Sequence, residues 1–187
     1  MIEAEFGILY FLQSLHTPWL DAVMKNITHL GDSGIFWILT GLALFCFKKT
    51  RRMGFCVLLS LAGGLLIGNI FLKNLVARDR PCWIDPTIQL LVASPKDFSF
   101  PSGHTCASFA SAFAIYKCKE VFPKKWRIAA MVLATLIALS RLYVGVHYPT
   151  DVLGGLIVGL FSGWAGWKIE ELIMKKRAEK KKSTDNK

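Results

Sequence analysis

The longest uncharged stretch of the sequence covers residues 53–72 and reads MGFCVLLSLAGGLLIGNIFL. A helix needs about 20 mainly apolar residues to cross the roughly 30 Å hydrocarbon core of a bilayer, and this stretch has that length. The composition agrees, since 53% of the 187 residues are hydrophobic and only 19% are charged. It excludes both a disordered chain and a soluble domain coated with charge. We therefore expect an all-α integral membrane protein.

Further apolar runs lie on both sides of this stretch. The run 128–146 is nearly as long but carries Arg141 close to its end, and the run 151–172 is apolar until Lys168. Shorter runs become membrane helices once polar flanks and tilt are allowed. These shorter runs are Phe6–Leu15, 34–47 and 104–116. The sequence thus predicts a bundle of six membrane-crossing helices.

Lys and Arg gather in three segments that alternate with the expected helices. The turn 48–52 holds four, the turn 117–127 holds five and residues 168–187 hold eight, together 17 of the 23 in the chain. Positively charged loops stay in the cytoplasm, so these segments are predicted to be cytoplasmic. We expect one membrane-embedded domain over residues 1–174, followed by a basic cytoplasmic tail over 175–187. Because this pattern explains the net charge of +10, nucleic-acid binding is not expected.

Glycines recur at four-residue spacing in two of the expected helices. They are Gly64 and Gly68 in one helix and Gly155, Gly159 and Gly163 in the other. Small residues at this spacing let helix backbones approach closely in a bilayer, although glycine is common in membrane helices generally. We expect a compact bundle.

Three polar clusters lie at the helix ends opposite the basic turns, which predicts a site at the extracytoplasmic end. The first contains Lys73 and Arg80, which are seven residues apart and precede Pro81. On one helix that ends at Pro81, these two side chains project from the same face. Two cations on one face suit a phosphate, and they equally suit side chains that reach from a helix end to the membrane surface.

The second cluster is Pro101-Ser102-Gly103-His104, at the start of the expected helix 104–116. Ser102 is a good helix N-cap, and Gly103 lets the backbone approach a ligand. The free N–H groups of such a helix end attract an anion, and His104 would stand beside it. Ordinary capping and a structural histidine explain the same residues.

The third cluster contains Arg141, His147 and Asp151. An arginine inside an apolar run normally faces a partner or a polar cavity, so Arg141 is a functional candidate. Pro149 suits the first turn of the last helix, which places His147 just before that helix. Asp151 then either accepts from one imidazole nitrogen, leaving the other free to attack, or stabilises the helix N-terminus.

Taken together, the clusters resemble the type 2 phosphatidic acid phosphatase family of membrane lipid phosphatases, which shares its core with soluble bacterial acid phosphatases and vanadium haloperoxidases. The family's motifs are Lys, six residues, Arg-Pro; then Pro-Ser-Gly-His; then Ser-Arg, five residues, His, three residues, Asp. The positions that match are Lys73, Arg80 and Pro81; residues 101–104; and Ser140, Arg141, His147 and Asp151. No motif position departs from the pattern.

The resemblance implies a catalytic role for each matched residue. His147 attacks the terminal phosphorus and forms a phosphohistidine, while His104 protonates the leaving oxygen and later activates water. Asp151 fixes the attacking tautomer of His147. The phosphate is bound by Lys73, Arg80, Ser102, Gly103 and Arg141. These fixed cations replace a metal ion, so neither a metal nor another cofactor is expected, and the five cysteines lack the Cys-x-x-Cys spacing of a zinc site.

A site at the outer membrane boundary favours a phosphate carried by a membrane lipid. Small bacterial undecaprenyl diphosphate phosphatases are among the family members that this chain resembles, so a polyprenyl diphosphate is the first expectation. Phosphatidylglycerophosphate or phosphatidate is the alternative within the family. A lipid or anion transporter and a haloperoxidase are the alternatives outside the phosphatases. The sequence leaves the oligomeric state open, as well as whether the loop 82–100 acts as a lid.

Overall fold

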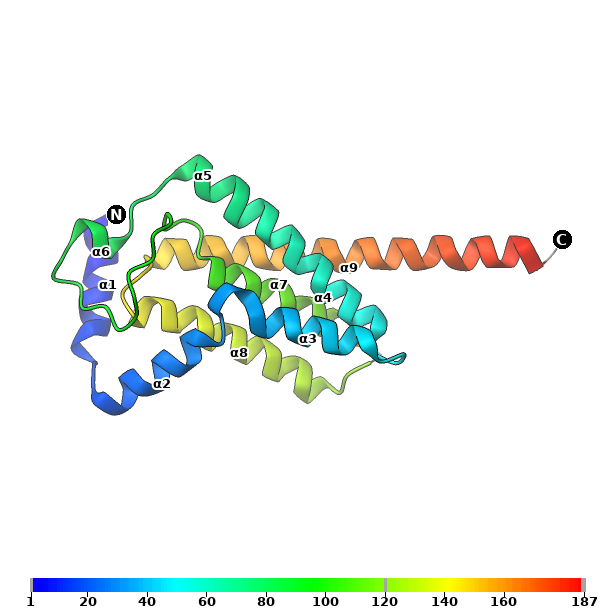
Figure 1. The fold of residues 1–187 in the computed structure, drawn as a ribbon, viewed down its shortest axis with the longest axis horizontal. Coiled ribbons are helices and arrows are strands. Elements are labelled where there is room, and N and C mark those ends of the chain that lie inside the picture. The colour runs from blue at the N-terminus through cyan, green and yellow to red at the C-terminus, as the bar shows by residue number, and fades with distance from the viewer. Residues whose placement is uncertain (1, 120, 186–187) are drawn as a thin grey trace.

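The fold is built from helices in the computed structural model, which describes residues 2–119 and 121–185 and contains no strand among them. Figure 1 shows α3, α4, α7, α8 and α9 running roughly side by side, with α1 across one end of the bundle. In chain order the helices are α1 (Ile2–Ser14), α2 (Pro18–His29), the 3-10 turn η1 (Asp32–Gly34), α3 (Ile35–Cys46), α4 (Arg51–Gly64), the π-helix η2 (Leu65–Leu72), α5 (Lys73–Val76), α6 (Pro81–Ile84), α7 (Gly103–Lys117), α8 (Lys124–Tyr143) and α9 (Pro149–Asp185).

Close backbone contact joins α7 to α9, and the glycines of α9 permit it. A Cβ atom on Gly155, Gly159 or Gly163 would lie only 2.6 to 2.8 Å from the backbone oxygens of Ser102, Cys106 and Ala110. Atoms that close clash, so larger side chains would force the two helices apart. The predicted close packing of this glycine stripe is therefore confirmed.

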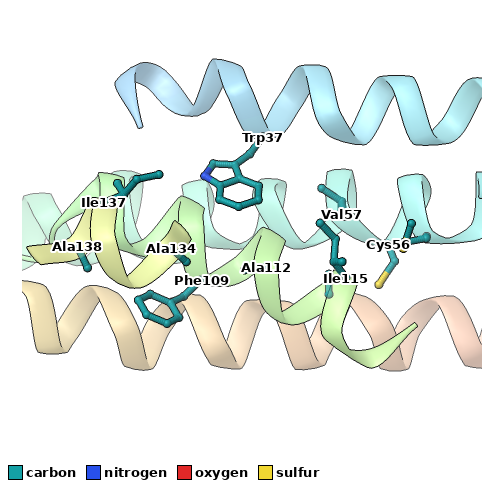
Figure 2. Packing of buried hydrophobic residues seen from close by; sticks show 11 residues of the cluster. Trp37, Cys56, Val57, Phe109, Ala112, Ile115, Ala134, Ile137 and Ala138 are labelled. Atoms are coloured by element: carbon teal, nitrogen blue, oxygen red, sulfur yellow. The ribbon is translucent and has the colours of Figure 1, made fainter. Parts of the chain in front are cut away.

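The apolar core lies between α3, α4, α7 and α8. Trp37 of α3 is 1% exposed and points into this core, near Phe109 of α7 and Ile137 of α8 (Figure 2). Its indole N–H donates to Ser108 Oγ at 3.0 Å, which satisfies a polar group that would otherwise be costly to bury. The core thus fixes how α7 lies against the helices that carry the remaining motif residues.

The count of six membrane-crossing helices is not confirmed. Among the described residues, three helical stretches are long and apolar enough to cross a bilayer: Arg51–Ile84, Lys124–Tyr143 and Pro149–Lys180. The pair Pro18–His29 and Asp32–Cys46, bent by 40°, is a candidate fourth span. The 13 residues of α1 extend only about 20 Å, which is too short for the hydrocarbon core, and this helix crosses the bundle end instead (Figure 1).

The two ends of the bundle differ in chemistry. The turn between α3 and α4 and the turn between α7 and α8 lie at one end, from which the C-terminal part of α9 projects (Figure 1). The segments that carry the three polar clusters lie at the other. The basic turns and the polar clusters thus lie at opposite ends of the bundle, as the sequence predicted. Beyond the bundle, α9 continues as a helix to Asp185, so the predicted tail begins inside a helix.

Candidate active site

Six of the eight predicted site residues line one cavity of about 900 Å³ at the end of the bundle opposite the basic turns. They come from four separate segments: α5 and the loop after it, the start of α7, the end of α8 and the turn before α9. The six residues are Lys73, Arg80, Gly103, His104, Arg141 and His147. The tertiary structure therefore brings together clusters that are far apart in the sequence.

Lys73 and Arg80 do not share a helix, so that prediction is wrong. The helix ends at Val76, because Ala77 adopts a left-handed conformation with φ of +46°, and Pro81 begins α6 instead of ending the previous helix. The two cations converge through their contacts. Lys73 Nζ and Arg80 Nη2 lie 2.5 and 2.8 Å from the two carboxylate oxygens of Asp97.

Arg80 is held in place by backbone carbonyls. It is 2% exposed, and its guanidinium donates to the carbonyl oxygens of Asp97 and Val146 at 2.7 Å each. Because several bonds fix the guanidinium, its charge is positioned before any ligand binds. Partial burial raises the pKa of Asp97, but the hydrogen bond from Lys73 and the charges of Lys73 and Arg80 outweigh this and lower that pKa to about 2.

The contacts of His147 assign its tautomer. Arg80 Nη1 lies 3.3 Å from His147 Nε2, and a guanidinium can only donate, so Nε2 is the unprotonated nitrogen. The proton is then on Nδ1, which lies 3.4 Å from Asp151 Oδ2. This distance exceeds that of a good hydrogen bond, and such bonds commonly tighten when substrate binds. Burial and the nearby charges of Arg80 and Arg141 lower the pKa of His147 to about 3, despite the opposing effect of Asp151.

Asp151 lies behind His147, fully buried, and is the centre of a polar network. Its carboxylate accepts from Ser99 Oγ and, at 2.8 Å, from the backbone N–H of Tyr148. Arg78 Nη1 donates to it at 2.7 Å, and Arg78 Nη2 donates to the buried Glu5 of α1 at 2.6 Å. The network holds the Asp151 carboxylate still, and it links α1 to the base of the site.

Ser102 and Gly103 have different surroundings. The fully buried Ser102 is the N-cap of α7, and its Oγ accepts from Thr105 N at 3.4 Å and Thr105 Oγ1 at 2.9 Å. The predicted N-cap is confirmed, but Ser102 does not line the cavity. Gly103 does, and a Cβ at this position would lie 2.9 Å from Asn69 Oδ1. A larger residue here would have to displace the Asn69 side chain of η2.

Arg141 contacts the last turn of α2, and His104 contacts the turn that follows α2. Arg141 is 4% exposed and donates from Nη1 to Thr28 Oγ1 at 2.5 Å, while its Nε has no hydrogen-bond partner among the described residues. His104 Nε2 lies 2.9 Å from Asp32 Oδ1. Residues that belong to none of the three motifs therefore hold both side chains in place.

Comparison with known proteins shows the family of this chain. The sequence pattern of the PAP2 superfamily matches residues 53–175, which include all three clusters. The chain belongs to the PAP2 superfamily. Phosphatidylglycerophosphatase B of Bacillus subtilis is 35% identical over 156 residues, which cover 78% of this chain and 73% of that protein. Undecaprenyl-diphosphatase of Sulfolobus acidocaldarius is 32% identical over 152 residues, which cover 81% and 71%.

A solved structure agrees with the PAP2 fold. The crystal structure of a transmembrane PAP2 type phosphatidylglycerolphosphate phosphatase from Bacillus subtilis matches with a TM-score of 0.76 and 33% identity. The match covers 91% of this chain and 86% of that one. These PAP2 relatives are phosphatases acting on lipids, so the resemblance read from the motifs is confirmed and a phosphatase activity is supported.

The site residues contact several side chains that the sequence analysis did not single out. They are Asp97, which binds two of the cations, Asp32 beside His104, Thr28 beside Arg141, and the Arg78–Glu5 pair beneath Asp151. Only Arg78 had a sequence signal, because it lies within the first motif. The others lie in segments that no local pattern connects with the motifs.

Proposed function

We propose that this PAP2 protein hydrolyses the terminal phosphate of a polyprenyl diphosphate through a phosphohistidine, at the extracytoplasmic face of the membrane. The observation that carries the proposal is the orientation of His147, whose unprotonated Nε2 faces a cavity lined by four Lys and Arg side chains. A pocket that only binds anions needs the cations but not an oriented nucleophile. The transporter alternative is therefore disfavoured.

The chemistry follows from the positions of the groups. His147 Nε2 attacks the terminal phosphorus, and the bond from phosphorus to the bridging oxygen breaks as the new N–P bond forms. His104 gives a proton to the departing oxygen, then takes one from the water that cleaves the N–P bond. Lys73, Arg80 and Arg141 stabilise the charge on the phosphoryl oxygens, with no metal ion required.

A lipid diphosphate suits the rest of the cavity. On one side it continues between α3 and α4, where Ile38, Leu58, Leu61 and Leu65 line it. This apolar surface suits a hydrocarbon chain. Lys96 lines the same cavity and offers positive charge to a second phosphate.

Phosphatidylglycerophosphate is the second candidate substrate, because a relative with 35% identity is named as a phosphatase of that lipid. The deciding experiment measures phosphate release by purified protein in detergent from polyprenyl diphosphates, phosphatidylglycerophosphate and phosphatidate. We expect the highest kcat/KM with the diphosphates. A preference of tenfold or more for a phosphomonoester lipid would assign the second candidate instead.

The nucleophile is tested with His147→Ala. We expect phosphate release to fall by at least about three orders of magnitude, since no other group can form the covalent intermediate. Acid quenching of the unmodified protein should trap an acid-labile phosphoenzyme that the variant lacks. His16→Ala is the matched control, because His16 does not line the cavity and its ring interacts with the carbonyl and ring of Tyr143. Turnover by the His147 variant at the control rate would remove His147 from the mechanism.

The membrane side is tested by labelling. Single cysteines replace Lys96 at the cavity or Lys180 on the protruding part of α9, and right-side-out vesicles receive a membrane-impermeant thiol reagent. We expect labelling above that of the parent chain only at position 96. The reverse result would invert the topology and place the site in the cytoplasm.

A further inference from the structure

The turn between α2 and α3 enters the active site, although it belongs to none of the three motifs. Its Asp32 lies between two histidines, with Oδ1 2.9 Å from His104 Nε2 and Oδ2 2.8 Å from His29 Nδ1. Asp32 and both histidines line the cavity. The carboxylate therefore contacts the residue assigned as the general acid directly.

The backbone of this turn is shaped around the His104 ring. A Cβ on Gly31 would lie 2.6 Å from His104 Cδ2 and 2.9 Å from Ile137 Cγ2, so only glycine leaves room for the imidazole. Ser33 and Gly34 then adopt left-handed conformations, with φ of +50° and +67°. Left-handed backbone is unfavourable for serine, so the fold maintains this turn against a local cost.

The contact with Asp32 decides which nitrogen of His104 faces the substrate. A carboxylate only accepts hydrogen bonds, so Nε2 carries a proton and donates it to Asp32. The side-chain hydrogen bond that His104 makes to the described residues is through Nε2, which leaves the other nitrogen, Nδ1, for a ligand. Nδ1 is thus the nitrogen available to exchange a proton with a ligand in the cavity.

We infer that Asp32 is a positioning residue, which holds His104 with Nδ1 available as the proton donor and stabilises the ring while it is positively charged. The role rests on the proposed function, in which His104 protonates the leaving oxygen. As the bond to that oxygen breaks, the Nδ1 proton moves to the oxygen, and Nδ1 recovers a proton from the water that cleaves the phosphohistidine. Asp32 keeps its charge throughout, as the carboxylate of a catalytic triad does.

The inference is tested with two phosphomonoesters that carry the same alkyl chain. One has an aliphatic leaving oxygen, which needs a proton to depart, and the other has a nitrophenyl leaving group, which departs without one. In Asp32→Asn we expect kcat for the aliphatic ester to fall about 30-fold or more, with KM within about twofold. The nitrophenyl ester should lose less than about threefold. Asp79→Asn, an exposed acid outside the cavity, controls for the lost charge and should change neither.

Equal losses on both esters, or no loss on either, would overturn the role of Asp32. If Asp32→Asn does not accumulate as folded protein, Asp32→Glu replaces it, because it keeps the charge and moves the carboxylate by one methylene. In this variant too, we expect kcat for the aliphatic ester to fall relative to kcat for the nitrophenyl ester. An unchanged ratio of these two values would refute the inference. Failure of the proposed histidine mechanism gives a different result, since His147→Ala would then release phosphate from both esters as fast as the unmodified protein.

Discussion

Replacing Asp97 by asparagine tests whether the carboxylate of Asp97 competes with phosphate for Lys73 and Arg80. The Asp97 carboxylate contacts both Lys73 and Arg80, so a phosphate that binds these cations must displace it. The fall of its pKa from 3.8 to about 2 corresponds to roughly 2.5 kcal/mol of preference for the charged form. The side chain is 56% exposed, and solvent screening reduces the energy of this interaction to about 1 kcal/mol.

An energy of about 1 kcal/mol corresponds to roughly a fivefold change in a binding constant. We therefore expect Asp97→Asn to lower the inhibition constant of vanadate, a phosphate mimic, about fivefold. The assay is competitive inhibition of phosphate release. Asp85→Asn is the matched control. Asp85 lies in the same loop as Asp97, residues 82–100, but it contacts Tyr10 and Thr87 outside the cavity. An unchanged or higher inhibition constant would show that Asp97 organises the two cations and does not compete for them.

Further predictions concern the third cation, the metal requirement, the helix contact and the effect of pH. Arg141→Lys keeps the charge but loses the planar donor pair, so kcat/KM should fall on the order of a hundredfold, whereas a simple membrane anchor would retain activity within about twofold. Phosphate release should be unaffected by excess chelator, and loss of activity that Mg²⁺ restores would contradict a site built from fixed cations. Gly159→Ala should destabilise the fold by about 1 to 3 kcal/mol in thermal denaturation, because the new Cβ would lie 2.7 Å from Cys106 O, while Gly7→Ala meets nothing within 4 Å and should not. Burial lowers the pKa of His147 to about 3, so between about pH 6.5 and 3 the unfolded chain binds this proton and the folded chain does not. The free energy of unfolding should therefore decrease as the pH is lowered through this range. His147→Asn should lose less of it between about pH 6.5 and 4.5.

The sequence by itself determined the features that depend on local chemistry. Hydropathy predicted membrane-spanning helices, since the length of an apolar run is a property of consecutive residues. Ser102 was identified as the N-cap of α7 and His147 was placed just before α9, because capping and the preference of proline for a first helical turn act within a few residues. The resemblance carried by the three motifs implied which cations and histidines meet, and six of the eight predicted residues line the cavity.

The tertiary structure alone decided how these groups are held. Asp97, Asp32 and Glu5 each contact a site residue at least 17 positions away in the chain, so no periodicity or spacing relates them to it. The end of α5 at Val76 also escaped prediction, because Ala77 adopts its left-handed conformation in a segment where Arg78 is bound to Glu5 and Asp151. Such contacts form only after the helices have packed, and the energy of that packing selects loop conformations that local propensity does not specify.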